Sequence, residues 1–138
     1  MEVLAAIFSG TLIFILSQYF LKFVLDPMKE LKQTISNIVV DLTYYANVYL
    51  NLIVPREKED LKFMKKFRLY ASRLRPQVDS IPFYNVLNEL LNLPSKKDIH
   101  NSVGILIFLS NVDSEMKVMK IDDKVMEIRK LLRIEDIA

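Results

Sequence analysis

The chain begins with a long stretch in which polar positions are almost absent. Residues 3–21, VLAAIFSGTLIFILSQYFL, carry no charge, and Gln18 is the one strongly polar side chain among them. A helix of these 19 residues rises roughly 28 Å, at about 1.5 Å per residue, close to the ~30 Å hydrocarbon core of a bilayer. The pattern predicts a membrane-spanning helix.

The flanks of this stretch favour an uncleaved anchor over a signal peptide. Glu2 precedes the apolar run, no Lys or Arg does, and no small-x-small cleavage site follows it. Lys22, Lys29 and Lys32 lie just after the run. Because positive charge favours the cytoplasmic side, we expect a protein of the cell inner membrane with its amino terminus outside.

Beyond the span, apolar residues recur at spacings of three and four, as on one face of a helix. Asp26 and Pro27 are typical of a helix start. We expect this helix to run almost directly out of the membrane, with a kink or a short break at Pro27. The predicted seam is long and packs along its whole length, and it comprises Met28, Leu31, Ile35, Ile38, Leu42, Tyr45, Tyr49 and Leu52.

Prolines and polar turns divide the rest of the chain into four further helices. Their expected ranges are 56–79, 82–93, 96–112, and 113 or 114 to 133. The fold class is therefore all-α. An N-terminal single transmembrane helix lies within residues 1–25, and residues 26–138 form a cytoplasmic up-and-down bundle of about five helices. The short helix 82–93 is expected to lie across the bundle.

Several local features of these helices are specific enough to check. Pro76 should kink or end its helix. Ser95 followed by Asp98 resembles a capping box, and the all-round apolar Val103–Leu109 marks the most buried helix. In the short helix, the side chains expected to be buried are Phe83, Val86, Leu87, Leu90 and Leu91.

The residue types that would support a reaction are scarce. Cysteine is absent and His100 is the only histidine, with Asp98 two residues away on a different helix face. Gly104 stands alone rather than in a phosphate-binding loop, and no Arg precedes His100 at the spacing of helical nucleases. We find no catalytic constellation, so we expect no enzymatic activity, no cofactor and no metal site, and we expect His100 at the surface or its boundary.

The predicted span carries small residues on one side. Ala6 and Gly10 are four apart and Ser17 is seven further on, a spacing that lets two membrane helices approach closely. Thr11 and Gln18 lie on the adjacent face, and an amide in lipid seeks a partner. These residues predict a homo-oligomer formed through the span, although small residues also occur by chance in such helices.

Positive charge is concentrated in one segment. From Arg56 to Arg75 there are eight basic residues and three acidic ones. The ordinary interpretation is a solvated helix face; the alternative is a surface for nucleic acid or anionic lipid. The candidate residues are Lys62, Lys65, Lys66, Arg68, Arg73 and Arg75. Nearby aromatic residues indicate core packing, with a ligand groove or base stacking as the alternative.

Short motifs follow the span in order: FVLDPMKELKQTISNI, YYAN, IPFY, LPSKKDI and LSN. With these motifs the chain resembles a set of small bacterial single-pass membrane proteins that have no assigned activity. The resemblance covers most of the chain. It implies a membrane-anchored helical protein, and it implies no functional residue.

Two functional hypotheses follow. The first is a membrane-anchored, non-enzymatic interaction and oligomerisation protein that contacts the lipid bilayer, itself and a protein partner. A sharper form of it is a membrane-perturbing or pore-type effector, with the few polar residues of the span as the lining. The alternative is a membrane-tethered binder of nucleic acid or anionic lipid through residues 56–75.

Overall fold

The computed structural model describes residues 1–51, 56–111 and 118–133. Its helices are α1 (Glu2–Phe20), the π-helical turn η1 (Leu21–Leu25), α2 (Asp26–Asn51), α3 (Arg56–Ser80), α4 (Tyr84–Leu90), α5 (Lys96–Leu109) and α6 (Val118–Leu131). No strand occurs in these residues. The all-α fold class is confirmed, with one long apolar helix ahead of a helical bundle. The expected break at residues 54–55 and the expected start of the last helix at 113 or 114 lie outside the described residues.

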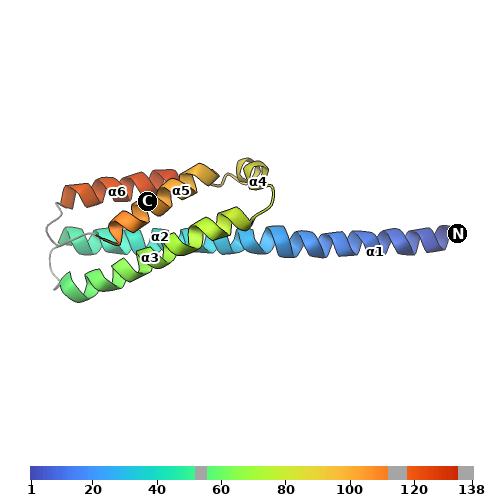
Figure 1. The fold of residues 1–138 in the computed structure, drawn as a ribbon, viewed down its shortest axis with the longest axis horizontal. Helices are drawn as coiled ribbons and strands as arrows, with labels where there is room; N and C mark the ends of the chain where they lie inside the picture. Colours follow the sequence, from blue (N-terminus) through green and yellow to red (C-terminus); the bar gives the residue numbers. More distant parts are fainter. Residues whose placement is uncertain (52–55, 112–117, 134–138) are drawn as a thin grey trace.

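The first half of the molecule is one uninterrupted rod. In Figure 1, α1 projects from the bundle and runs straight into α2. The expected break at Pro27 is wrong. Pro27 has no N–H for the carbonyl of Phe23, but the preceding turn is wound wider, and the Asp26 N–H donates to the Leu21 carbonyl five residues back. This π-helical turn carries the helix past the proline.

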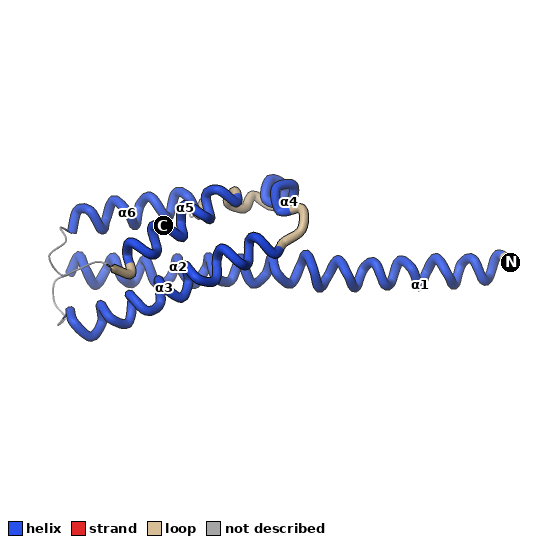
Figure 2. Tube along the Cα trace, in the orientation of Figure 1, coloured by secondary structure: helices blue, strands red, loops and turns tan. Residues whose placement is uncertain are grey.

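Four helices of the bundle run up and down beside one another. Helix α2 contacts α3 and α6, and α5 also contacts α3 and α6, which gives the cyclic order α2–α3–α5–α6. Helix α4 connects α3 to α5 and lies across them, so Figures 1 and 2 show it nearly end-on. It lies at the end of the bundle from which α1 emerges, which we call the α1 end.

The predicted seams form the core. Along α2 the fully buried side chains include Leu31, Ile38 and Leu42, and along α6 they include Ile128. Tyr49 and Leu52 fall outside the residues whose side chains are described. The aromatic residues at the α2–α3 contact pack edge to face, with the Tyr45 ring 5.1 Å from that of Phe63 and 5.2 Å from that of Phe67. Core packing, rather than a ligand groove, is their role.

Two helices differ from expectation in detail. Pro76 does not end α3, which continues to Ser80; the carbonyl it leaves unpaired belongs to the exposed Ser72 and can be hydrated. Helix α5 starts as predicted, because the Ser95 Oγ accepts from the Asp98 N–H at 3.1 Å. The apolar run in α5 is less enclosed than expected, since Ile107 remains 48% exposed.

The prediction for the short helix is wrong for most of its buried face, since Leu87 is the one predicted side chain that packs against the core. Phe83 is 79%, Val86 67% and Leu90 78% exposed, while Tyr84 and Asn88 are the residues that face the bundle. A hydrogen bond from the Tyr84 hydroxyl to the Pro94 carbonyl, 2.7 Å long, helps to fix this orientation. Burial also raises the pKa of Tyr84 to about 12. An apolar face of α4 is therefore left uncovered.

Candidate functional site

The largest apolar surface of the molecule is the outside of α1. None of the residues of this helix is buried, and its exposed side chains include Phe8, Leu12 and Phe14. Within the described residues, it belongs to the one continuous helix that is long and apolar enough to cross a membrane, judged by length and composition. A surface this large and this apolar is typical of a helix whose natural surroundings are not water.

The small residues predicted to form one face of the span lie on the same side of α1, with the exposed Ile13 between Gly10 and Ser17. We call this row of small residues the strip. Ala6, Gly10 and Ser17 are all exposed, and a Cβ placed at Gly10 would meet no atom within 4 Å. The hydroxyls in this helix bond to its own backbone: Ser17 to the Ile13 carbonyl at 2.7 Å and Thr11 to the Ile7 carbonyl at 2.9 Å. The strip is thus free for close approach by another helix.

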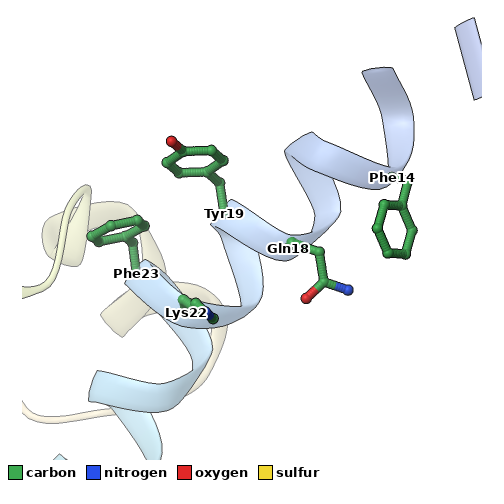
Figure 3. A pocket seen from close by; sticks show the side chains of 5 residues that line it. All are labelled: Phe14, Gln18, Tyr19, Lys22 and Phe23. Carbon is green, nitrogen blue, oxygen red and sulfur yellow. The ribbon is translucent and has the colours of Figure 1, made fainter. Parts of the chain in front are cut away.

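Gln18 lies to one side of this strip, at the end of α1 nearest the bundle. Figure 3 shows its amide directed away from the helix, on the same side as Phe14, while Tyr19 points the other way. Tyr19 and Phe23 stack with ring centroids 5.5 Å apart, and Lys22 lies between these two groups. Aromatic and basic side chains at this level are typical of a membrane–water interface.

The basic residues predicted as one surface divide between two sides of α3. Lys62, Lys66 and Arg73 follow a spacing of four and seven on the side towards α2, while Arg68 and Arg75, seven apart, lie on the side towards α5. Two of them already have partners on other elements. Lys66 pairs with Asp41 at 2.7 Å, and Arg68 donates to Asn111 at 2.7 Å. Lys65 is exposed on the outer face between them.

Asp41 is the charged group most enclosed by the bundle. Its side chain is 12% exposed, and its two oxygens accept from Lys66 and, at 2.5 Å, from the Tyr70 hydroxyl. Burial, followed by the hydrogen bond to Asp41, raises the pKa of Tyr70 well above its usual range. Every partner in this group comes from α2 or α3. The arrangement joins two helices and leaves no carboxylate open to a substrate.

His100 takes part in a second contact between helices rather than in a site. It is about one-third exposed, and its Nε2 lies 3.3 Å from the Asp79 carboxylate, outside hydrogen-bonding geometry. Lys96 reaches the same carboxylate at 2.8 Å, and its hydrogen bond is the main cause that lowers the pKa of Asp79. The boundary position expected for His100 agrees with this, and its neighbour is Asp79 rather than Asp98.

Across the ranges 1–51, 56–111 and 118–133, no group of three His, Asp or Glu side chains could hold a metal ion. The comparisons with protein-family models, with curated proteins and with solved structures found no match. The resemblance inferred from the short motifs therefore stays a prediction. Function has to be argued from the geometry alone.

The exposed apolar side chains of α4 were not predicted from the sequence. Phe83, Val86 and Leu90 are exposed on α4 at the α1 end of the bundle, so a second apolar surface lies near the exit of the span. The signal that could have found it is weak. The tyrosine and asparagine at positions 84 and 88 are four apart and share the opposite face.

Proposed function

We propose that this protein is a single-pass membrane protein whose bundle is a non-enzymatic assembly module held at the cytoplasmic face of the membrane. The observation behind the proposal is the complete exposure of α1, an apolar helix that nothing in the described bundle covers. A bilayer supplies the missing surroundings, and the direct join of α1 to α2 then sets the bundle immediately beside it.

The charges around the join support the orientation. Lys22, Lys29 and Lys32 are all exposed close to the end of the apolar run. The other end of α1 has Glu2 and the amino terminus. Positive-inside bias therefore favours an amino terminus outside the inner membrane and a cytoplasmic bundle.

Assembly through the span is the second part of the proposal. The strip formed by Ala6, Gly10 and Ser17 allows two α1 helices to pack at short range, and Gln18 can bond across the contact near its end. The partners proposed are a second copy of the chain and the lipid bilayer. Because the hydroxyls of Thr11 and Ser17 bond to their own helix, a pore lining receives less support than a packed helix pair.

Cross-linking of the full-length protein tests the assembly. The chain has no cysteine, so Gly10→Cys introduces a single thiol on the strip. Phe8→Cys is the matched control, because it lies two residues away at similar depth and on the opposite side of the helix. We expect oxidation in membranes to give a disulfide-linked dimer for Gly10→Cys and little for Phe8→Cys. Equal cross-linking at both positions, or none at either, contradicts the proposed contact.

The alternative function, binding of nucleic acid through the basic residues of α3, has weaker support. Those residues lie on two sides of the helix, and Lys66 and Arg68 are engaged with Asp41 and Asn111. A nucleic-acid surface needs several cations directed to one face so that they can neutralise successive phosphates. Salt-dependent RNA or DNA binding by the full-length protein would restore this alternative.

A further inference from the structure

Helix α4 presents an apolar surface that the bundle does not use. Phe83, Val86, Leu90 and Leu91 are 79%, 67%, 78% and 42% exposed. Val86 and Leu90 are four apart on the side of the helix opposite Tyr84 and Asn88, which are both buried. Val86, Leu90 and the preceding Phe83 form a patch on so short a segment, rather than the scattered exposure that is normal at protein surfaces. Leu91 lies at the edge of this patch, nearer to Tyr84.

The orientation of this patch is fixed by contacts on both sides of α4. Ile81 and Leu93 are buried before and after the helix, and the Tyr84 hydroxyl donates to the Pro94 carbonyl at 2.7 Å. The Leu93 N–H donates to the Asn88 carbonyl at 2.8 Å. Turning α4 over to hide the patch would break these contacts and expose Tyr84. The apolar face is therefore held outwards.

Phe83 is unfavourable in water for two separate reasons. Its ring is exposed, and its backbone adopts φ 56°, in the left-handed region that a bulky residue rarely occupies. Glycine or asparagine is the ordinary residue at such a position. Asn92, which follows the C-terminal end of α4, is an example with φ 51°. An environment that accepts the ring would explain why phenylalanine occurs there.

The place of α4 in the fold indicates which environment this is. The helix lies at the α1 end of the bundle, with its axis across that of α1 (Figures 1 and 2). A bilayer crossed by α1 would have its surface at this end, with α4 roughly parallel to it. Arg133 donates to Asn92 at 2.7 Å, beside the patch, and Lys22 lies at the end of the span. Apolar side chains with cations close by are typical of a segment that lies in a membrane surface containing anionic lipid.

We propose that α4 is a membrane-surface helix, whose residues Phe83, Val86 and Leu90 enter the boundary between headgroups and acyl chains of anionic phospholipid. This inference rests on the proposed membrane span. Seven residues are few for binding from solution, but α1 already holds α4 at the membrane, so no cost of recruitment arises. With α1 and α4 both in lipid, the bundle has two contacts with the membrane, which fix its rotation about α1.

Depth measurements on the full-length protein test this proposal. Single cysteines, introduced at one position at a time, carry a spin label in bilayer discs of phosphatidylethanolamine and phosphatidylglycerol. Oxygen concentrates in lipid and a nickel complex stays in water, so the ratio of their collision rates with the label reports depth. Val86→Cys and Leu90→Cys test the patch, and Asn85→Cys is the matched control, because Asn85 is exposed on the same helix but lies about 100° or more around it from both patch positions. Leu12→Cys and Met126→Cys mark the span and an exposed apolar position on α6.

We expect the oxygen-to-nickel ratio at Val86→Cys and Leu90→Cys to exceed that at Asn85→Cys several-fold, and Met126→Cys to resemble Asn85→Cys. A water-like ratio at both patch positions, with a lipid-like ratio at Leu12→Cys, overturns the role of α4 and leaves the span intact. A water-like ratio at Leu12→Cys overturns the span itself. Labels on the patch that both reagents fail to reach would show that protein covers it, which also overturns the lipid proposal.

Discussion

Helices α1 and α2 are two halves of one continuous rod, yet they meet opposite surroundings. Over residues 2–20 the apolar side chains occur all round the helix and none is buried. Beyond Val24 most of them lie on one stripe, of which Leu31, Ile38 and Leu42 are completely enclosed, and Val40 on the opposite side is 64% exposed. The backbone is helical in both halves, so the distribution of apolar residues around the helix is what assigns each half its solvent.

The comparison also shows how each half treats its polar groups. In α1, Thr11 and Ser17 donate to carbonyls one turn back in the same helix. In α2, Asp41 reaches out of its helix to Lys66 and Tyr70 of α3. A helix surrounded by lipid has to satisfy its polar groups internally or through another span, whereas a bundle helix uses them to fix its neighbours.

The largest expected difference comes from one substitution made in both halves. Leu31→Ala empties part of the bundle core and should lower the free energy of unfolding by about 2–5 kcal/mol. Leu12→Ala removes the same atoms from a surface that packs against nothing in the bundle. Chemical denaturation of the two full-length variants in detergent measures this. Equal losses would show that α1 and α2 belong to one packed unit and would break the comparison.

A charge placed in the middle of α1 tests the proposed contact of this helix with lipid. Leu12→Lys should disfavour membrane insertion by about 3 kcal/mol, the cost of a lysine at the centre of a span. We expect a smaller fraction of the protein to resist alkaline extraction from membranes, while the bundle keeps its unfolding midpoint. Leu12→Ala is the control and should remain inserted. If both variants stay fully inserted, α1 does not lie in the hydrocarbon core.

Removal of the buried Asp41 carboxylate tests how polar contacts stabilise the bundle. Asp41→Ala leaves the buried Tyr70 hydroxyl and the partly buried Lys66 without their acceptor, which should cost about 1–3 kcal/mol of unfolding free energy. Thr11→Val is the corresponding change in α1 and should leave the unfolding of the bundle unaltered. Thermal unfolding followed by circular dichroism distinguishes them. A neutral Asp41→Ala would mean that the three groups interact mainly with water.

The smallest expected effect concerns how the helices begin. Helix α2 continues from η1, but α5 begins anew and uses Ser95 as its cap. Ser95→Ala should therefore destabilise the bundle by about 1 kcal/mol. Ser72→Ala is the control, because that hydroxyl is exposed inside α3 and bonds only to the Leu69 carbonyl. A loss for Ser72→Ala as large as that for Ser95→Ala would remove capping as the cause.

Features that depend on local sequence could be predicted, whereas features that depend on the three-dimensional arrangement of the chain could not. The seam of α2 and the capping by Ser95 were predictable because each rests on local spacing or on one short motif. The close join of the span to α2 was predicted as well, but the absence of a break at Pro27 was not, because it depends on how the preceding turn is wound. The separation of Arg68 from Lys66 onto two sides of α3 follows from their spacing of two, but their partners Asn111 and Asp41 lie far away in the sequence and could not be predicted.

The apolar face of α4 shows where such prediction stops. Its seven residues have apolar side chains on more than one face, so the sequence does not decide which face packs. Contacts from outside the helix decide it, above all the hydrogen bond from Tyr84 to the Pro94 carbonyl and the burial of Ile81. The positions of Ala6, Gly10 and Ser17 on one side of α1 could be predicted from their spacing, whereas the contact proposed for them involves a second copy of the chain.

The most direct test of the central claim is the topology of α1. Glu2→Cys places a single thiol at the start of α1, and Met126→Cys places one on α6 of the bundle. Both positions are exposed. In intact spheroplasts, a membrane-impermeant maleimide should label Glu2→Cys at once and should label Met126→Cys only after permeabilisation. Labelling of both positions without permeabilisation, or of Met126→Cys alone, would contradict a span that holds the bundle in the cytoplasm.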